Sequence, residues 1–230
     1  MKLGLVVLAF LVSPAAWAGP QTKPNEAETH YNLGNALDNK GDHDGAIVEY
    51  RAAIRLKPDF PQAHYNLGNA LRSKGDLEGA MGEYRAAIRL KADFAKAHNN
   101  LGMALDEKGD HDGAIAEYRE AIRLKPDFAD AHYNLGSALD DKGDHDGAMV
   151  EYRTAIRLKP DFPQAHYNLG NALYLKSNVD GAIVEYRTAI RLKPDYADAH
   201  YNLSAALELK GDREGALAEK RKASELDSKK

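Results

Sequence analysis

The chain has no cysteine among its 230 residues, and this absence removes several classes of site at once. It excludes disulfides, thiolate metal ligands and a cysteine that would accept a lipid. An exported protein of this composition has to be stable by packing alone. Tryptophan is nearly absent as well, because Trp17 is the only one in the sequence.

Long apolar runs are also lacking. The apolar segment 3–12 has only ten residues, follows the positive Lys2 and precedes the small-x-small sequence Ala16-Trp17-Ala18. Ten helical residues cover about 15 Å, roughly half the apolar thickness of a bilayer. The pattern is typical of a cleaved signal peptide at residues 1–18, and the alternative is an uncleaved membrane anchor. We expect a periplasmic or secreted protein, processed after Ala18 and not stably inserted in a membrane.

The sequence lacks a strong net charge and the usual catalytic motifs. Its 31 Lys and Arg residues against 35 Asp and Glu give a net charge of −4, or −5 once Lys2 is removed with the signal peptide. This mild negative charge argues against a nucleic-acid partner. There is no cysteine nucleophile, no phosphate-cradling glycine loop and no Gly-x-Ser-x-Gly. We therefore expect neither enzymatic activity nor a cofactor.

What the chain does have is a repeat. The block His-Tyr-Asn-Leu-Gly-Asn-Ala-Leu begins at His30, and close copies begin at 64, 98, 132, 166 and 200, always 34 residues apart. Self-similarity at this period indicates stacked helical pairs, and such a stack usually serves as a binding surface. After a polar lead-in at 19–26, we predict six units in the range 27–230. Their boundaries are 27–60, 61–94, 95–128, 129–162, 163–196 and 197–230.

Within one unit the pattern predicts two helices. Residues 30–37 place apolar side chains on one helical face, and Gly41 ends that helix. Asp42 is expected to cap the second helix, which Pro58 terminates. By the same reasoning Asp59 is expected to cap the first helix of the next unit.

The repeat resembles a known family. Its period, Leu-Gly pair, later Ala, following aromatic, next Ala and closing Pro look like the tetratricopeptide repeat. The run at 122–131, Ile-Arg-Leu-Lys-Pro-Asp-Phe-Ala-Asp-Ala, is similar to the repeat arrays of O-GlcNAc transferases, although the six units leave no room for a catalytic domain. The resemblance implies an all-α fold, a right-handed α-solenoid of six helix-turn-helix repeats. The chain departs from the family pattern by placing histidine at the fourth position of each unit.

The last unit differs from the others in polarity. Lys220 stands where five units have tyrosine, and Ser224 stands where the first unit has Ile54. A terminal unit has no neighbour to bury these side chains, so we expect a polar cap.

The histidines and the turn acids suggest metal sites only superficially. All nine histidines are periodic, and equivalent ones lie about a helix contact apart, ~8–10 Å or more, whereas zinc needs nitrogens at about 2 Å. Asp42-His43-Asp44-Gly45 resembles the start of a calcium loop but lacks its third acidic ligand and its final glutamate. We expect packed structural histidines, helix caps and no metal.

One polar residue type is unbroken along the first helices. In the resembling transferase arrays an asparagine ladder holds extended polypeptide, and a side-chain amide can both donate and accept hydrogen bonds. The alternative is that each asparagine bonds within the stack. The predicted ladder is Asn32, Asn66, Asn100, Asn134, Asn168 and Asn202.

Tyrosines and further asparagines flank this ladder. Tyrosines are favoured at interfaces, although a stripe at helical spacing is often only packing. The candidate groove residues of this kind are Tyr31, Tyr65, Tyr133, Tyr167 and Tyr201, with Asn99 interrupting the series, and Asn35, Asn69 and Asn171. The lysine clamp of family members that bind chaperone tails is absent.

Charge is unevenly distributed between the faces that the resemblance implies. The inner positions are mostly acidic, with Asp140 and Asp141 in the fourth unit, and they become apolar at Tyr174 and Leu175 in the fifth. An acidic groove favours a basic ligand. The predicted partner is an extended protein or peptide segment that is basic and has a hydrophobic anchor.

The second helices carry five pairs of arginines. We favour neutralisation by the turn aspartates over a basic ridge for anionic polymers. The pairs are Arg51 and Arg55, Arg85 and Arg89, Arg119 and Arg123, Arg153 and Arg157, and Arg187 and Arg191.

Together these patterns predict an exported, non-catalytic scaffold or adaptor that binds peptide in its concave face. The alternative is a regulatory or assembly subunit that docks on an enzyme or envelope complex through the convex arginines.

Overall fold

The computed structural model describes residues 25–228 and folds them into α-helices without any strand. The predicted signal peptide at 1–18 lies outside the described residues. The first helices of the pairs are α1 Glu26–Asp38, α3 Pro61–Ser73, α5 Ala95–Glu107, α7 Ala129–Asp141, α9 Pro163–Leu175 and α11 Ala197–Leu209. The second helices are α2 His43–Leu56, α4 Leu77–Leu90, α6 His111–Leu124, α8 His145–Leu158, α10 Val179–Leu192 and α12 Arg213–Asp227. None of these helices is long and apolar enough to cross a membrane.

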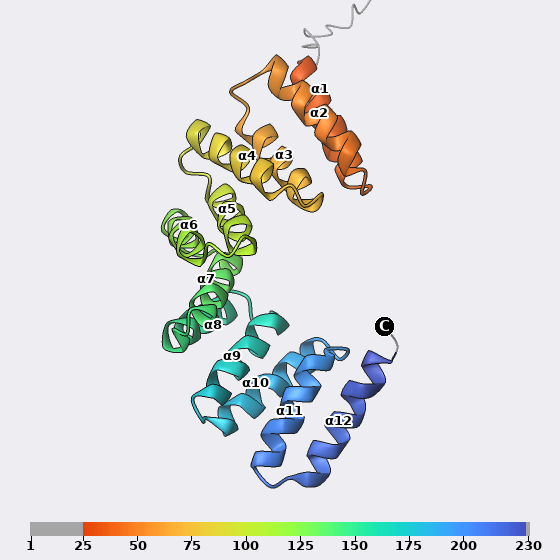
Figure 1. Cartoon of the computed structure of the whole chain (residues 1–230), viewed down its shortest axis with the longest axis vertical. Coiled ribbons are helices and arrows are strands. Elements are labelled where there is room, and N and C mark those ends of the chain that lie inside the picture. Colours follow the sequence, from red (N-terminus) through yellow and green to blue (C-terminus); the bar gives the residue numbers. More distant parts are fainter. Residues whose placement is uncertain (1–24, 229–230) are drawn as a thin grey trace, which may run out of the picture.

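The helix pairs stack into the right-handed α-solenoid expected from the repeat. Each helix packs on its partner and on the next helix along the chain, and every first helix also contacts the next first helix. Consecutive second helices within the described range do not contact one another. The first helices therefore converge along the inner, concave side, and the second helices diverge along the outer, convex side. The arc of Figure 1 shows this arrangement, with α3 and α5 inside α4 and α6.

The start of each second helix follows the sequence prediction. Asp42 accepts a hydrogen bond from the backbone N–H of Gly45 at 2.9 Å, and an aspartate or asparagine does the same before each of the other second helices. Gly41 has a φ of +82°, in the left-handed region that glycine enters without strain. The turn motif is thus a helix cap.

The predicted cap at Asp59 is wrong. Helix α3 begins at Pro61, and its N-cap residue is Phe60, which has no side-chain capping bond. The aromatic ring is turned back instead, with its centroid 4.8 Å from that of Tyr31 in α1 and Lys57 Nζ 5.0 Å above it. Proline at the first helical position supplies the start, because its fixed φ suits a helix.

A glycine and a tyrosine hold the two helices of a repeat together. Tyr50 is almost completely buried, and a Cβ added to Gly34 would lie 2.7 Å from its ring. The same pairing recurs through repeat 5. In repeat 6, Lys220 is exposed where the tyrosine would be, and Ser204 replaces the glycine and donates to the carbonyl of Ala216 at 2.8 Å. The last described repeat is thus more polar at these positions than the others, as the sequence predicts.

Candidate binding groove on the inner face

The asparagine ladder is hydrogen-bonded across the repeats. Asn66 Nδ2 donates to the hydroxyl of Tyr31 at 3.2 Å and to Asn35 Oδ1 at 2.7 Å, so both amide protons are used. Asn100 and Asn202 repeat the pattern with the tyrosine and asparagine of the preceding repeat. The stack therefore takes the donor half of these amides, and the oxygen of Asn100 accepts from Asn99 at 3.2 Å as well.

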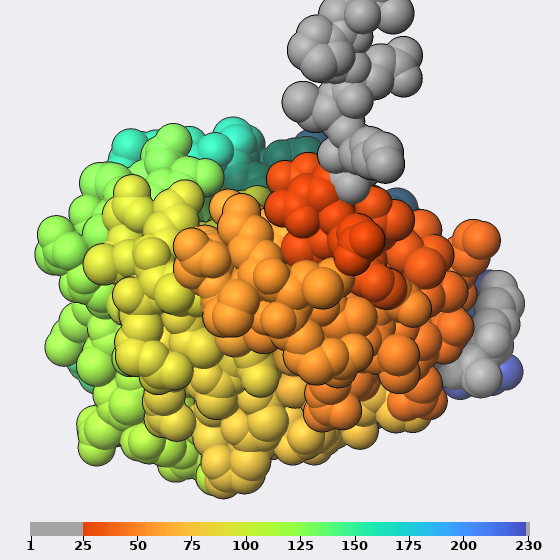
Figure 2. All heavy atoms as spheres, turned by 90° about the horizontal axis from the view of Figure 1, so that it is seen from above, coloured from red at the N-terminus to blue at the C-terminus, as the bar shows by residue number. Residues whose placement is uncertain are grey.

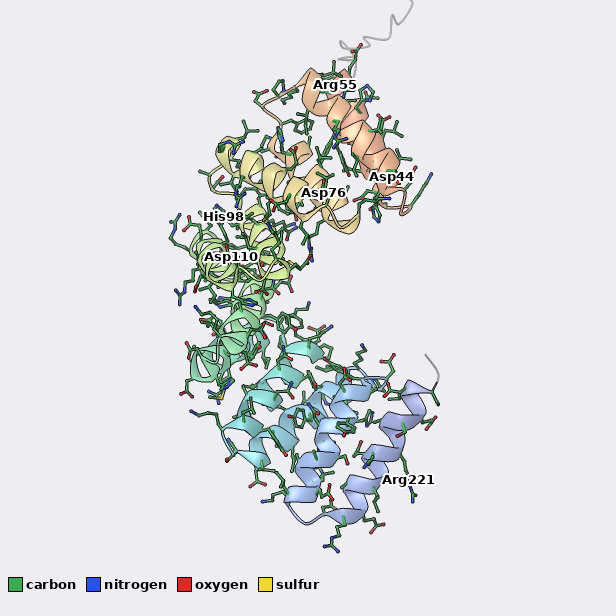
Figure 3. All side chains as sticks on the ribbon, viewed as in Figure 1. Asp44, Arg55, Asp76, His98, Asp110 and Arg221 are labelled. Carbon is green, nitrogen blue, oxygen red and sulfur yellow. The ribbon has the colours of Figure 1, made fainter. Side chains whose placement is uncertain are left out.

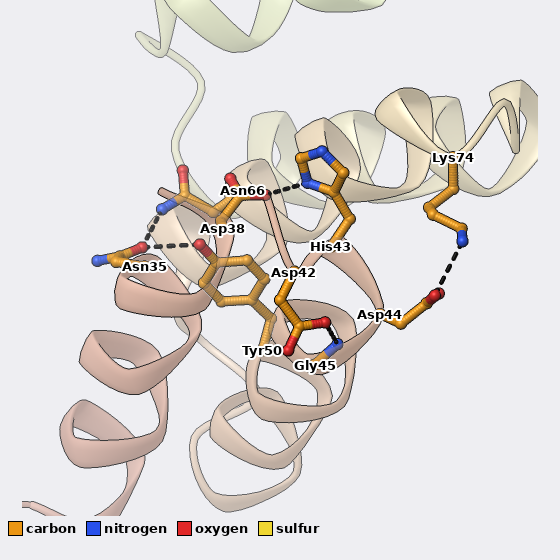
Figure 4. A network of polar contacts seen from close by, with 9 residues as sticks. All are labelled: Asn35, Asp38, Asp42, His43, Asp44, Gly45, Tyr50, Asn66 and Lys74. Atoms are coloured by element: carbon orange, nitrogen blue, oxygen red, sulfur yellow. Dashed lines mark hydrogen bonds and ion pairs between the residues drawn. The ribbon is translucent and has the colours of Figure 1, made fainter. Parts of the chain in front are cut away.

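The buried tyrosine of each pair extends this network. Tyr50 donates its hydroxyl to Asn35 Oδ1 at 2.9 Å, which links Tyr31, Asn66, Asn35 and Tyr50 in one chain of bonds. Figure 4 shows the part formed by Asn35, Asn66 and Tyr50. Burial raises the pKa of Tyr50 well above its ordinary value, so the phenol stays neutral and donates. Tyr84 and Tyr186 make the equivalent bonds to Asn69 and Asn171.

Three ladder positions depart from this scheme. Asn134 donates to Asn99 Oδ1 at 3.0 Å, because repeat 3 has no tyrosine there. Asn168 donates to the hydroxyls of Tyr133 at 3.3 Å and Tyr152 at 3.5 Å. Asn32 is exposed, since no described repeat precedes it. The sequence spacing gives no sign of these differences.

The first set of histidines belongs to the internal packing. His132 contacts Glu151 Oε2 through Nδ1 at 2.6 Å and the carbonyl of Pro126 through Nε2 at 3.1 Å. These two acceptors suit an imidazolium, which donates from both nitrogens. The hydrogen bond to Glu151 raises the pKa of His132, and the bond to Glu83 raises that of His64. The prediction of structural histidines is confirmed.

The second set pairs with inner-face aspartates. His111 Nδ1 lies 2.6 Å from Asp106 Oδ1, and Asp141 brings a third ligand-type atom within 4.8 Å of both. The hydrogen bond to Asp106 raises the pKa of His111, which favours the protonated form that does not ligate a metal. Burial, followed by the charge of Asp106, raises the pKa of Asp141. The group is thus a concentration of carboxylates around one histidine.

Some inner acids are already paired. Arg72 binds Glu107 through both Nε and an Nη atom at 2.8 and 2.6 Å, and Asp130 lies 3.8 Å from Lys159 Nζ. Asp140 contacts His145, whereas Asp141 is exposed beside Asp106. The structure therefore gathers Asp106, Asp140 and Asp141 on the inner side of repeats 3 and 4.

The inner face becomes apolar toward the C-terminal end. Leu175, Tyr201 and Leu209 are about 60% exposed, at 61%, 59% and 65%. Of these three, Leu175 lines a hollow of about 260 Å³. Its lining is Asn171, Tyr174, Leu175, Tyr186, Asn202 and Ala205. Exposed side chains of this size mark a surface suited to contact with another molecule.

The expected neutralisation of the outer arginines by turn aspartates is wrong. All ten are exposed, and among them only Arg123 forms an ion pair within the described residues, with Glu120 on its own helix. The geometry explains this result, because Asp44 and Arg55 stand at opposite ends of α2 (Figure 3). The turn acids pair instead with lysines of the next repeat, as Asp44 does with Lys74 at 2.9 Å.

The sequence analysis did not identify two sets of partners: the lysines that pair with the turn acids and the glutamates that bind the histidines. The lysine that follows each first helix bridges to the preceding repeat in five places. The glutamate that binds each first-set histidine is periodic as well. It recurs without exception at Glu49, Glu83, Glu117, Glu151, Glu185 and Glu219. This fixed distance of 19 residues from histidine to glutamate was the available signal.

Comparison with known proteins agrees with this architecture. A family model described as TPR repeat matches residues 39–71, 68–109, 102–140, 137–177 and 170–211. Among curated proteins no match is found. A crystal structure of MamA is 29% identical with a TM-score of 0.65, covering 71% of this chain and 95% of MamA. YrrB, described as a TPR protein with an unusual peptide-binding site, is 25% identical with a TM-score of 0.65, over 77% of this chain and 91% of its own.

A third structure supports the fold alone. PilF of Pseudomonas aeruginosa is 21% identical with a TM-score of 0.78, over 89% of this chain and 98% of its own.

Proposed function

Because the chain belongs to the tetratricopeptide-repeat family, we propose that it is an exported, non-catalytic scaffold that binds an extended protein segment along its concave face. The bound segment is basic and carries a hydrophobic anchor at one end. The peptide-binding site in the name of YrrB supports this class of ligand for a chain with the same repeat.

The observation that carries the proposal is the change of chemistry along equivalent inner positions. Repeat 4 has Asp140 and Asp141 where repeat 5 has Tyr174 and Leu175. The acidic part lies beside Asp106, and the apolar part adjoins the 260 Å³ hollow. A basic chain lowers the repulsion among the carboxylates, and an apolar side chain covers the exposed leucines. The two parts thus favour a ligand that has both a basic stretch and an apolar side chain, and they fix the direction in which it lies along the groove.

The binding test uses a lysine-rich peptide with an apolar end, and an acidic peptide of the same length. Asp140→Lys with Asp141→Lys should weaken capture mainly through the on-rate, and the loss should shrink at high salt. Tyr174→Ala with Leu175→Ala should act mainly on dissociation. Arg153→Gln with Arg187→Gln on the convex face is the matched control. Equal binding of the basic and acidic peptides at low salt contradicts the proposal.

The choice of groove variants follows from the ladder. Replacing Asn100 or Asn168 by alanine removes hydrogen bonds within the stack as well as a ligand contact. Substitutions at Tyr174 and Leu175 avoid this ambiguity for affinity capture, because Leu175 is exposed and Tyr174 is only half-buried. Proteins that the wild type retains and this variant loses are the ligands of the groove.

Export has its own test. The mass of the protein from the exported fraction should correspond to a chain that starts at Gly19, and its tryptophan absorbance should be lost with Trp17. A mature chain that retains Trp17 contradicts cleavage after Ala18.

A second candidate function rests on the convex face. Nine of its ten paired-helix arginines have no ion-pair partner in the described part of the chain, so the outer side carries exposed positive charge. Such a surface suits docking on an acidic face of an enzyme or envelope complex, or on an anionic polymer. The Arg153→Gln, Arg187→Gln variant decides between the two functions, because it should weaken this docking and leave peptide capture unchanged.

A further inference from the structure

Repeat 3 lacks two polar groups of the inner face at neighbouring positions of its first helix. Asn99 stands where the other five repeats have tyrosine. One helical turn later, Met103 stands where repeats 1, 2 and 5 have asparagine. Each change removes a group that the inner face otherwise uses.

The first change leaves an aromatic ring without its neighbour. In four repeats the inner tyrosine packs against the ring that directly precedes the next first helix, with centroids 4.8 to 5.0 Å apart. In repeat 3 the corresponding ring is Phe128, and among the described residues it has no such ring partner, because Asn99 takes the place of the tyrosine. A hollow of about 430 Å³ lies there instead, lined by Phe128, Asn99, Met103, Tyr133 and other side chains. A phenol ring fits this space, because a tyrosine fills the equivalent position in the neighbouring repeats.

The second change leaves a hydroxyl without an acceptor. Tyr50, Tyr84 and Tyr186 donate to the asparagine that repeat 3 lacks. Tyr118 is only 2% exposed as a whole, and its hydroxyl forms no hydrogen bond to another described residue. No buried polar atom of the described residues is left without a partner, so this hydroxyl is open to solvent and not enclosed. It borders a smaller hollow of about 120 Å³ that adjoins the first through Met103, Tyr133 and Asn134. Burial raises the pKa of Tyr118, so the hydroxyl remains a donor directed at a site where a ligand can accept.

We propose that repeat 3 receives a tyrosine side chain of the bound peptide in this hollow. The inference rests on the proposed peptide-binding function and adds the identity of one ligand residue. The ligand ring packs on Phe128 as the chain's own tyrosines pack on theirs. The hydroxyl of the ligand lies close to Asn134 and Tyr118, in the position that the hydroxyls of Tyr31 and Tyr65 occupy in their own repeats. The ligand thereby restores the chain of hydrogen bonds that the two substitutions interrupt.

Asn99 forms the floor of the hollow and does not close it. It is 4% exposed, and its Oδ1 accepts from Asn134 at 3.0 Å. Its Nδ2 lies 3.2 Å from Asn100 Oδ1 and 3.5 Å from Met103 Sδ. A side chain with these partners is held in place, so the space above it is open to a ligand.

The carboxylates around the smaller hollow also favour a particular kind of residue near the ligand tyrosine. The smaller hollow is lined by Asp106 and Glu107, and Asp141 lies close to Asp106. In an extended chain, residues i and i+2 point to the same side and lie about 7 Å apart. A lysine or arginine two residues from the tyrosine therefore reaches these carboxylates.

The first experiment varies one position of a basic peptide with an apolar end. The series Lys-x-Tyr, Lys-x-Phe, Lys-x-Leu and Lys-x-Ala is compared by calorimetry with the wild-type protein. Replacing tyrosine by alanine should weaken binding about tenfold or more, as expected of a buried aromatic anchor. Phenylalanine should bind about threefold to tenfold more weakly than tyrosine, because it lacks the hydroxyl. Equal affinities across the series overturn the proposal.

Two variants of repeat 3 distinguish the contribution of the ligand's aromatic ring from that of its hydroxyl. Asn99→Tyr fills the hollow with the residue of the other repeats, so the preference for tyrosine over alanine should disappear while the thermal midpoint stays equal or rises. Met103→Asn gives Tyr118 an acceptor and leaves the hollow open. It should keep the preference for an aromatic ring and reduce the difference between tyrosine and phenylalanine. An Asn99→Tyr protein that still prefers the tyrosine peptide overturns the proposal.

A small probe distinguishes this proposal from the peptide-binding function itself. N-acetyltyrosinamide should shift the NMR signals of the Phe128 and Tyr133 rings in the wild type and leave them unchanged in Asn99→Tyr. If the probe binds in this way and no basic peptide does, the hollow is real and the proposed function is wrong. If basic peptides bind and the probe fails to perturb these rings, the proposed function stands and the tyrosine site is overturned.

Discussion

The first and last described repeats, each with a described neighbour on one side only, treat the other side in opposite ways. In repeat 6 the side chains that would serve a following repeat are changed, with Lys220 in place of tyrosine and Ser224 in place of isoleucine. In repeat 1 the side chains that would serve a preceding repeat are kept. Leu33 is 47% exposed, whereas its counterparts Leu67 and Leu203 are 2% and 1% exposed. Seen along the array from that end, repeat 1 forms the near surface (Figure 2).

This difference identifies which interface each residue serves. Repeat 6 retains the side chains that contact the preceding repeat. Asn202 bonds to Tyr167 and Asn171, and His200 contacts the carbonyl of Pro194. Repeat 1 retains what faces forward, because its Tyr31 and Asn35 accept from Asn66. Each helix pair thus carries two half-interfaces, one toward the preceding repeat and one toward the following repeat. The stability of the stack includes a contribution from every interface in which two such halves meet.

The comparison predicts its largest effect for the backward-facing leucine. Leu101→Ala should lower the free energy of unfolding by about 2–5 kcal/mol, because it leaves a cavity in a packed interface. Leu33→Ala, at the equivalent but half-exposed position, should cost far less than its interior counterpart. Urea unfolding followed by circular dichroism measures both. Similar losses for the two variants would mean that exposure does not distinguish the ends.

A second prediction concerns the glycine that accommodates the buried tyrosine. Gly136→Ser should destabilise by about 1–3 kcal/mol, because its Cβ would lie 2.7 Å from the ring of Tyr152. The reverse change, Ser204→Gly, should cost less, since Lys220 places no ring there and only the bond to Ala216 is lost. Thermal unfolding of both variants gives the comparison. The pairing argument fails if Gly136→Ser is as stable as the wild type.

Much of the fold followed from periodic positions, and the errors have a common cause. Helix pairs, the Asp42 cap and the polar last repeat depend on residues within one turn or on the absence of a neighbour, which a sequence displays directly. Asp59 was misassigned because the start of α3 depends on a ring contact between Phe60 and Tyr31, which lie 29 residues apart in the sequence. Local rules cannot detect such a contact.

The site was harder to predict than the fold for the same reason. The bonds of Asn66 join residues 31 and 35 positions apart, so they depend on the register of the stack. The arginines were assigned to turn acids by proximity in sequence, although a 14-residue helix separates its ends by about 20 Å. The sequence did display Asn99 as an interruption, but only the structure places Phe128 beside the space that it leaves.

The ladder gives a third and smaller test of the two half-interfaces. Asn66→Ala removes the donors to Tyr31 and Asn35 and should cost about 1 kcal/mol, the net value of ordinary hydrogen bonds. Asn32→Ala should be close to neutral, because this side chain is exposed at the end of the array. Denaturant midpoints of the two single variants decide the matter. Equal costs would contradict an inter-repeat role for the ladder nitrogen.

The smallest effect expected is a dependence of stability on pH. It arises at the histidines that contact the preceding repeat. The bonds to Glu83 and Glu151 raise the pKa of His64 and His132, whose other nitrogens contact the carbonyls of Pro58 and Pro126.

Since the folded state holds these protons more tightly than the unfolded chain, their contribution is complete below the unfolded pKa of about 6.5. It is lost as the pH rises through the raised folded values. The free energy of unfolding should therefore fall as the pH rises above about 6.5, as measured by urea titrations at increasing pH. Glu83→Gln with Glu151→Gln removes the main cause of the shift and should flatten the slope. A wild-type slope of the opposite sign would show that groups other than these interior contacts control the response, and that the joined half-interfaces are insensitive to the charge of their histidines.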